Sequence, residues 1–361
     1  MTDSTTLAAD LVEIPSHEDE TEVGTYIEEW LRAETDSTVE RDRHGNVIAR
    51  RGSGETALAF VGHHDVVPPD ESQVTEDGYV VEERDGRLYG RGAADMKGAV
   101  AAAMCAFRDA TLDGSVELVF ASFVGEETGG VGARGAIEDG FGPEYAVVGE
   151  GSTNYSVDGV TDVVVAHRGR RGSTIVAEGS AAHASEPEAG ENAIYRGVDA
   201  IELVRDLPFP ETTVLGHEMR GSVAVTEIAG GSAWNVIPES CTVTVDERTV
   251  PGERTPLERV EEVPGVSLEI EQDLPPMACD DAAFAEFVLE VATAQQDGEP
   301  AHVDKPHATD AGWLAQAGTT CLVCGPAEPG EAHTADESVS VAVLERCYDI
   351  YRAVAEQFEP T

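Results

Sequence analysis

Residues 61–68 have the sequence VGHHDVVP and end an apolar run that begins at Thr56. The run has the composition of a buried strand, and it stops at His63, which is followed two residues later by Asp65. In open α/β sheets, ligands bind at the carboxyl ends of the strands. An imidazole there can hold a metal ion, and a nearby carboxylate can orient the ring. A lone His-x-Asp also occurs in ordinary polar loops, so the choice depends on the rest of the chain.

Three apolar runs of the chain end in side chains that can bind a metal ion. The runs cover residues 56–61, 116–124 and 145–148, and they are followed by His63, by Glu126 and Glu127, and by Glu150. Helical patterns separate the runs, and strands that alternate with helices form parallel sheets. Because parallel strands end at the same edge of their sheet, we expect these side chains to converge. This convergence favours a metal site over a polar loop.

The pattern of the chain changes at about residue 167 and changes back near residue 275. Between these points short strands follow one another with few helices, and DLPPM at 273–277 is typical of a linker. The last part is again helical around one apolar run, residues 319–324. We therefore predict an α/β catalytic domain with a mainly parallel sheet covered by helices on both faces, formed by residues 1–168 and 276–361. An inserted α+β domain would comprise residues 169–275.

The composition excludes several classes of partner. The chain of 361 residues carries 70 acidic and 23 basic residues, which gives a net charge of -47. Such a surface repels nucleic acids and anionic membranes, so we expect neither as a partner. No apolar run approaches the ~20 residues of a membrane span, and the N-terminal residues do not resemble a secretion signal. The protein is thus expected in the cytoplasm.

Two further motifs have simpler interpretations. Cys321 and Cys324 form a CxxC inside an apolar run, and without a second CxxC we interpret them as strand residues rather than as a zinc or redox site. The glycines of residues 130–135 match a dinucleotide-binding fingerprint. Residues 125–128 separate them from the preceding strand, however, where that fingerprint requires a tight turn. Neither motif gives His63 or the acidic strand ends a role.

The chain resembles the zinc-dependent amidohydrolase family that contains succinyl-diaminopimelate desuccinylase, acetylornithine deacetylase, aminoacylase and the carboxypeptidase G enzymes. The matching segments follow the family's order and are GHHDVVP (62–68), GRGAADMKG (90–98), GEETGG (125–130), VVGEGS (147–152), GSAAHASEPEAGENAI (179–194), GGSAWNVIP (230–238), TDA (309–311) and GPAEPGEAHTADE (325–337). They span nearly the whole chain. The resemblance implies a catalytic domain like that of two-zinc aminopeptidases, with an inserted domain that acts as a lid and dimer interface.

The resemblance also implies two divalent metal ions. Zinc suits imidazole and carboxylate ligands, and cobalt or manganese are alternatives. The implied ligands, with Asp95 as the bridge, are His63, Asp95, Glu127, Glu150 and His333. Glu126 would be the general base that takes a proton from the attacking water and passes it to the leaving amine, while Asp65 would orient His63. The alternative for Glu126 and Glu127 is a solvated acidic pair at the start of a helix.

The inserted domain would supply the remaining functional residues. By the same resemblance, His183 would donate a hydrogen bond to the oxyanion, from the partner subunit of a homodimer. Asn235 would position the substrate, and Arg248 or Arg171 would bind its carboxylate. The alternative for each arginine is an ion pair with one of the many acidic residues.

The expected reaction is hydrolysis of the amide of an N-acyl amino acid. Segments such as HRGRRGS (167–173) resemble the desuccinylases of lysine biosynthesis most closely. TDA at 309–311 replaces the TSD that those enzymes tend to carry, which leaves open acetylornithine deacetylase and the related lysine/ornithine carrier-protein hydrolases. A dipeptidase or aminoacylase also remains open. The alternative of a different class, an inactive metal-binding homologue, requires a missing ligand or base, whereas all six positions are filled.

The charge of the chain leads to a prediction about salt. The acidic residues are spread over the whole length, and Lys97 and Lys305 are the only lysines. Molar salt shortens the Debye length to about 3 Å and relieves the repulsion among exposed charges. We expect a salt-adapted, halophilic protein whose thermal unfolding midpoint rises with KCl concentration. A midpoint that does not depend on KCl would contradict this expectation.

Overall fold

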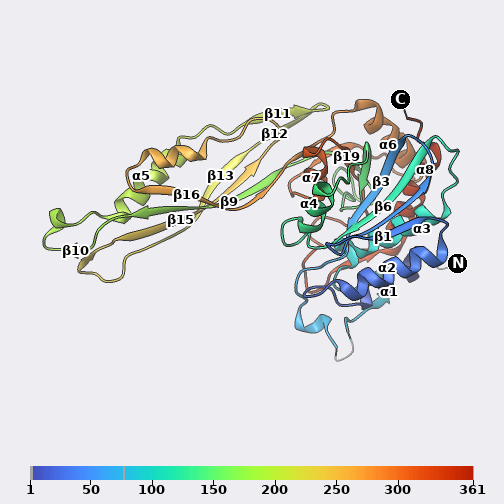
Figure 1. The fold of residues 1–361 in the computed structure, drawn as a ribbon, viewed down its shortest axis with the longest axis horizontal. Coiled ribbons are helices and arrows are strands. Elements are labelled where there is room, and N and C mark those ends of the chain that lie inside the picture. The colour runs from blue at the N-terminus through green and yellow to red at the C-terminus, as the bar shows by residue number, and fades with distance from the viewer. Residues whose placement is uncertain (1–2, 76–77, 361) are drawn as a thin grey trace. The chain divides into compact units, whose positions relative to one another are not determined.

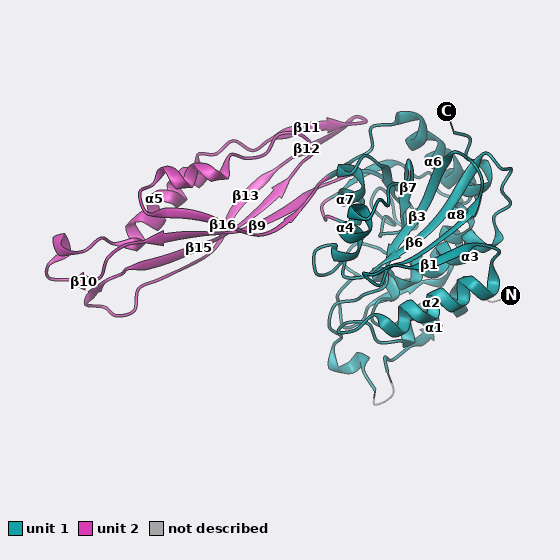
Figure 2. Ribbon diagram, viewed as in Figure 1, with its two compact units in different colours: residues 1–166, 277–305, 309–361 teal, residues 167–276, 306–308 magenta. Residues whose placement is uncertain are grey.

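The computed structural model describes residues 3–75 and 78–360, which belong to two compact units (Figure 2). Unit 1 comprises Met1–Ala166, Met277–Lys305 and Thr309–Thr361, and unit 2 comprises His167–Pro276 and Pro306–Ala308. The domain boundaries predicted from the sequence, after residues 168 and 275, lie close to the points where the chain passes between the units. The catalytic role of the first domain and the lid and dimerisation role of the inserted domain stay predictions.

A nine-stranded sheet forms the centre of unit 1, in the order β1-β2-β6-β3-β7-β19-β8-β17, with β18 paired to β8 (Figure 1). Its strands are β1 (Thr38–Arg41), β2 (Val47–Gly52), β3 (Thr56–His63), β6 (Val116–Phe123), β7 (Tyr145–Val148), β8 (Val163–His167), β17 (Met277–Ala278), β18 (His302–Lys305) and β19 (Thr320–Val323). Strands β6, β3, β7 and β19 pair in parallel, whereas β1 and β2 are antiparallel at one edge. The predicted α/β fold with a largely parallel sheet is confirmed.

Helices cover both faces of this sheet because the central strands are apolar on both. Phe60 of β3 contacts Tyr351, and Phe120 of β6 contacts Phe107, with ring centroids 5.4 and 6.2 Å apart. Tyr351 belongs to α8 and Phe107 to α3, and both helices lie on one face of the sheet (Figure 1). The alternate residues, such as Val61, form a buried cluster with α4 and α7 on the other face. The α-helices of unit 1 are α1 (Ser4–Glu13), α2 (Thr21–Glu34), α3 (Gly98–Asp109), α4 (Val131–Glu138), α6 (Ala282–Ala294), α7 (Asp310–Gln316) and α8 (Val341–Gln357).

A small sheet of unit 1 joins two segments that are distant in the sequence. Strands β4 (Glu82–Arg84), β5 (Arg87–Tyr89) and β20 (Ser338–Ser340) are antiparallel, with Ser338 opposite Tyr89. The pairing of β20 with β5 brings residues 333–337 next to residues 90–95. Both segments carry predicted metal ligands.

Unit 2 is a four-stranded antiparallel sheet with one helix on it. The strand order is β13-β15-β9-β16, and α5 packs on the sheet through a cluster that includes Ala200, Val204 and Val243. The elements are β9 (Gly169–Glu178), α5 (Ala193–Arg205), β13 (Ser222–Gly230), β15 (Ser240–Thr249) and β16 (Val266–Leu274). Two ribbons of two strands each complete the unit. One pairs β10 (Ala182–His183) with β14 (Val236–Ile237), and the other pairs β11 (Glu211–Val214) with β12 (His217–Arg220).

The chain returns from unit 2 to unit 1 between Pro276 and Met277, within the segment interpreted as a linker. Strand β16 ends at Leu274 and β17 begins at Met277, so this link is short. One expectation for the chain order was wrong. The last part of the chain also contains β17, β18 and β20 besides the predicted strand near residues 319–324. These strands have four residues or fewer, which is too short for an alternation of apolar and polar residues to be recognised.

The glycines of residues 130–135 are explained by close packing. A Cβ atom on Gly132 would lie 2.3 Å from Oδ1 of Asn46, and one on Gly130 would lie 2.5 Å from Nε1 of Trp313. Cys321 lies in β19 and Cys324 directly follows it, both as buried free thiols.

Candidate metal centre

The carboxyl ends of β6, β3 and β7 lie side by side, with β3 in the middle. His63 is the last residue of β3 and is level with Phe123, the last residue of β6. Glu126 and Glu127 follow β6 within four residues, and Glu150 follows β7 within two. The predicted convergence of these side chains at one edge therefore results from the strand order.

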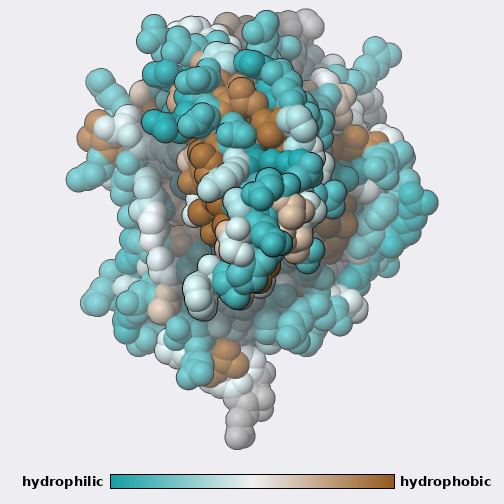
Figure 3. Space-filling model, turned by 90° about the vertical axis from the view of Figure 1, so that its left-hand side faces the viewer, coloured by the Kyte–Doolittle hydropathy of each residue, from teal (hydrophilic) through white to brown (hydrophobic). Residues whose placement is uncertain are grey.

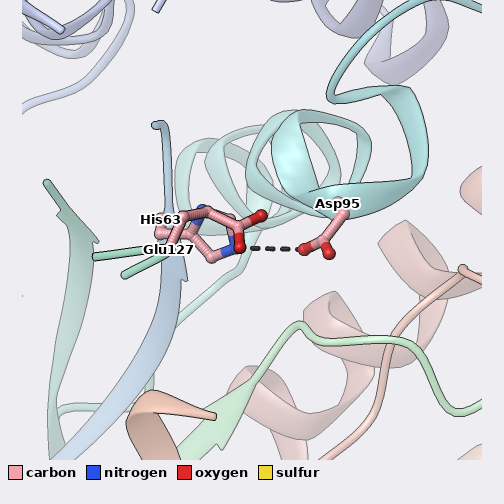
Figure 4. A group of neighbouring side chains, drawn as sticks. All are labelled: His63, Asp95 and Glu127. Atoms are coloured by element: carbon pink, nitrogen blue, oxygen red, sulfur yellow. Dashed lines mark hydrogen bonds and ion pairs between the residues drawn. The ribbon is translucent and has the colours of Figure 1, made fainter. Parts of the chain in front are cut away.

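Asp95 lies between two histidines. Its Oδ1 is 3.1 Å from Nε2 of His63, and its Oδ2 is 3.2 Å from Nε2 of His333. Figure 4 shows the imidazole of His63 facing the carboxylate of Asp95. One carboxylate thus directs a different oxygen to each ring, which is the arrangement needed by a group that joins two metal ions.

Glu127 lies beside His333, and Glu150 lies beside His63. Oε1 of Glu127 is 2.9 Å from Nε2 of His333, and Oε1 of Glu150 is 3.5 Å from Nε2 of His63. One ligand atom from each of His63, Asp95 and Glu127 lies within 4.8 Å of the others, which is compact enough for a shared ion (Figure 4). All five predicted ligands come together in unit 1.

The acidic neighbours in this cluster raise the pKa values of both histidines. Hydrogen bonds to Asp95 and Glu127 raise the pKa of His333 to about 10. Although burial opposes protonation, Asp65, Asp95 and Glu150 hold the pKa of His63 well above its usual range. Asp95 is buried too, but hydrogen bonds from both histidines keep its pKa well below its usual range. The donor set therefore calls for positive charge between its members, and divalent cations fit it.

Asp65 contacts both the histidine and the acidic turn. The ring nitrogen Nδ1 of His63 donates to the backbone carbonyl of Asp65 at 3.0 Å, which leaves Nε2 facing the acidic groups. The carboxylate of Asp65 lies 3.4 Å from the same Nδ1. It also accepts hydrogen bonds from the backbone N–H groups of Glu126 and Glu127, at 3.1 and 3.0 Å. The side chain thus holds one predicted ligand and the turn that carries the next.

Glu126 is accompanied by an acidic residue to which sequence reasoning gave no role. Burial, together with Asp310, Glu150 and Asp95, raises the pKa of Glu126 well above its usual range. Asp310 begins α7 and is 3% exposed, and burial raises its pKa to about 7. Neither of its carboxylate oxygens has a hydrogen-bond partner among the described residues. The TDA motif was the signal for this position, but the motif does not say what the aspartate faces.

The residues predicted in unit 2 fall into two groups. His183 ends β10 and Asn235 directly precedes β14, where its carbonyl accepts a hydrogen bond from the N–H of Ala184. Arg248 of β15 pairs with Asp246 at 2.7 Å. Arg171 of β9 is buried, and its guanidinium lies 2.7 Å from Glu258. Both arginines form ion pairs within unit 2, as the alternative to carboxylate binding anticipated.

Comparison with known proteins decides the family. The model of peptidase family M20/M25/M40 matches residues 59–357. The chain belongs to this family. It is 32% identical over 341 residues to an acetylornithine deacetylase of Myxococcus xanthus, an alignment that covers 89% of this chain and 85% of the relative. It is 34% identical over 232 residues to a succinyl-diaminopimelate desuccinylase of Acidiphilium cryptum. This alignment covers 61% of this chain and 57% of the relative.

The fold of this M20 chain is also that of solved relatives. The aminopeptidase PepT of Bacillus cereus superposes with a TM-score of 0.80 and 19% sequence identity, over 98% of this chain and 97% of the other. The family match confirms the resemblance stated from the sequence, and the protein is a hydrolase of the metallopeptidase and deacylase type that acts on amides. Within residues 3–75 and 78–360, no helix is both long and apolar enough to cross a membrane.

Both lysines of this M20 chain are buried in unit 1. Nζ of Lys305 donates to Oε2 of Glu150 at 3.1 Å and to the carbonyl of Gly151 at 3.1 Å. The other carboxylate oxygen of Glu150 faces His63. Nζ of Lys97 donates to the carbonyl of Ile14 at 2.6 Å. Sequence reasoning noted that these are the only lysines and gave them no role, although their rarity was a signal.

Replacing Lys305 tests its contact with Glu150. A Lys305→Met change leaves Glu150 buried without its cationic partner, so we expect a loss of unfolding free energy of about 3–5 kcal/mol in the presence of a chelator. Zinc should recover part of this loss because it would neutralise the same carboxylate. Urea unfolding with chelator and with zinc measures both quantities.

The matched control is Arg50→Met, which removes a half-exposed ion pair with Glu117 on neighbouring strands. Such pairs contribute roughly 0.2–1 kcal/mol, and zinc should not change the result. An effect of Lys305→Met no larger than that of Arg50→Met, or one that zinc leaves unchanged, would contradict the role of Lys305.

Proposed function

We propose that the protein is a metal-dependent hydrolase that cleaves the amide of an N-acyl amino acid. The observation that carries this proposal is the position of Asp95 between His63 and His333, with one carboxylate oxygen directed to each ring. The partly buried carboxyl of Glu126 beside this group supplies the second requirement, a residue that can accept and return a proton.

The five ligands divide into two sets that share Asp95. His63 and Glu150 belong to one set, and Glu127 and His333 to the other. Imidazole and carboxylate donors in these proportions suit zinc, with cobalt or manganese as alternatives. When bound, two such ions would polarise the substrate carbonyl. They would also lower the pKa of a water molecule toward neutrality.

The protein's own groups would do the remaining work. Glu126 accepts a proton at its carboxylate as water attacks and returns that proton to the leaving nitrogen. Asp65 holds the backbone of Glu126 and Glu127 and keeps Nδ1 of His63 engaged, so that the base and the ligands keep their relative positions. Asp310 adds negative charge next to Glu126, which favours the protonated state that the second half of the reaction requires.

Two substrates are favoured by specific observations. N-succinyl-diaminopimelate is the first, because of the desuccinylase-like segments and the desuccinylase at 34% identity. N-acetylornithine is the second, because an acetylornithine deacetylase aligns over a larger share of this chain. Both are N-acylated diamino acids. A lysine or ornithine carrier-protein hydrolase, a dipeptidase and an aminoacylase belong to the same reaction class.

Unit 2 is proposed to bind substrate and to form a homodimer. His183 and Asn235 lie together on one ribbon and next to Trp234, which is 97% exposed. In this proposal the ribbon supplies the oxyanion donor and a positioning amide to the active site of the partner subunit. Arg248, one third exposed, and Arg171 are the candidates for the substrate carboxylate.

Exposed apolar residues support the dimer. The surface in Figure 3 is mostly hydrophilic, with apolar side chains among the hydrophilic ones in the middle of the view. In unit 2, Tyr195 and Val198 of α5 are 70% and 42% exposed, and Ile228 of the edge strand β13 is 50% exposed. An edge strand offers unpaired backbone groups to a second copy of the chain.

The function is tested by removing and restoring the metal. We expect dialysis against a chelator in high salt to abolish hydrolysis, and zinc or cobalt to restore it. N-succinyl-diaminopimelate, N-acetylornithine and a set of dipeptides are the substrates, and release of the free amine is the measurement. A Glu126→Gln variant should lose turnover by several orders of magnitude and still bind the metal, because the amide cannot accept the proton.

Two results would contradict the proposal. Absence of turnover with every N-acyl amino acid and dipeptide, in high salt with metal, would favour the inactive metal-binding homologue. Activity of Glu126→Gln comparable to that of the unchanged protein would exclude Glu126 as the base.

The dimer is tested by placing charge on its proposed surface. We expect the unchanged protein to sediment as a dimer in high salt and Val198→Glu to shift it toward the monomer, because a buried unpaired carboxylate is costly at an interface. The matched control is Val157→Glu, at a 60% exposed valine of unit 1. A monomeric unchanged protein, or equal effects of both changes, would exclude this interface.

A further inference from the structure

Glu337 is a buried acidic residue to which the proposed mechanism gives no part. It is 1% exposed and lies four positions after His333 in the segment HTADE. Its backbone carbonyl accepts a hydrogen bond from Gly90 at 3.1 Å, and the next residue begins β20, which pairs with β5. The residue therefore lies where the segment of His333 joins the small sheet.

The carboxylate of Glu337 binds the backbone of the loop that carries Asp95. Oε1 accepts hydrogen bonds from the N–H groups of Gly92, Ala94 and Asp95, at 2.9, 3.1 and 3.1 Å. Oε2 forms an ion pair with Arg91, whose side chain is 3% exposed. All of these partners are donors, and an ionised carboxylate is the side chain that accepts from every one of them.

The segment of His333 needs such an anchor. His333 has a φ of 65°, a left-handed conformation that is uncommon for residues other than glycine. Its side chain is 50% exposed, so burial alone does not fix the ring. A non-glycine residue keeps this conformation only when the surrounding structure determines it, and Glu337 is the buried contact that ties this segment to the loop of Asp95.

We propose that Glu337 is a positioning residue of the metal centre, which joins the loop of Asp95 to the segment of His333 and thereby sets the separation of these two ligands. The inference rests on the proposed function, since it assumes that both residues bind metal. Glu337 does not contact the metal in this proposal. It acts through the backbone N–H of Asp95 on one side and through the chain between Glu337 and His333 on the other.

The test is metal binding to variants of the full chain. In Glu337→Gln, an amide NH₂ group replaces the oxygen that faces Arg91, so the contact between the two segments is broken on that side. We expect the dissociation constant for Co²⁺, measured by calorimetric titration of the metal-free protein, to rise at least tenfold. The visible absorption spectrum of the bound Co²⁺ should also change, because it depends on ligand geometry.

A second variant keeps the test decisive if Glu337→Gln does not fold. Glu337→Asp retains the charge but is one methylene shorter, so it cannot reach Arg91 and the three N–H groups together. We expect it to fold and to bind Co²⁺ more weakly than the unchanged protein, with an altered spectrum. An unchanged dissociation constant and spectrum in the variant that folds would overturn the proposal.

The matched control is Asp162→Asn, a change of the same kind in unit 1. Asp162 is fully buried, and its carboxylate accepts hydrogen bonds from Ser156 and Ala301. We expect it to lower the thermal unfolding midpoint and to leave Co²⁺ binding within twofold of the unchanged protein. An equal loss of binding in Asp162→Asn would overturn a specific role for Glu337.

The two proposals fail in different ways. If the unchanged protein binds no divalent ion, the proposed function is wrong and the inference falls with it. If the unchanged protein binds Co²⁺ and the folded Glu337 variant binds it equally well, only the role of Glu337 is wrong.

Discussion

Carboxylates repel one another, and the parallel strands β6, β3 and β7 bring several of them to one edge of a sheet. The strand ends deliver Glu126, Glu127 and Glu150. Neighbouring segments add Asp65, which binds the backbone of Glu126 and Glu127, and Asp95, which contacts His63 as Glu150 does. Water screens these charges poorly, because Asp65 and Glu150 are buried and the other three residues are partly buried. The surrounding structure compensates with the imidazoles of His63 and His333, with Lys305, and with backbone N–H groups directed at Asp65 and Glu337.

This compensation differs from one acidic residue to another, and the difference gives Asp95 and Glu126 different roles. Hydrogen bonds from two imidazoles keep the pKa of Asp95 low, so it stays an anion that can bind cations. Among the residues that the structure describes, none donates a hydrogen bond to the carboxylate of Glu126, and burial raises its pKa. A cation beside Glu126 would lower that pKa again, so the two effects oppose each other at the group that must both accept and return a proton. Carboxyl groups whose environments push their pKa values apart are the usual source of separate acid and base roles.

The sequence predicted the strand ends better than the residues that support them. Convergence of His63 and Glu150 follows from apolar runs and strand–helix alternation, both of which are local patterns. Lys305, Asp310 and Glu337 belong to short elements near the end of the chain, where no periodicity identifies a strand or its partner. The contacts of Lys305 depend on β18 pairing with β8, and those of Glu337 on β20 pairing with β5. Such pairings between distant segments are set by tertiary packing, and a single sequence does not encode them in any local pattern.

The two lysines show how the acidic composition and the site are connected. The chain has 23 basic residues and a net charge of -47, yet only Lys97 and Lys305 are lysines. Both are buried, and both donate to backbone carbonyls. An ammonium group is a compact charge with three donors, so it fits between a carboxylate and a carbonyl where the planar guanidinium of arginine does not. Arginine forms the exposed ion pairs and also the buried pair with Glu337, whereas the cation beside Glu150 is a lysine.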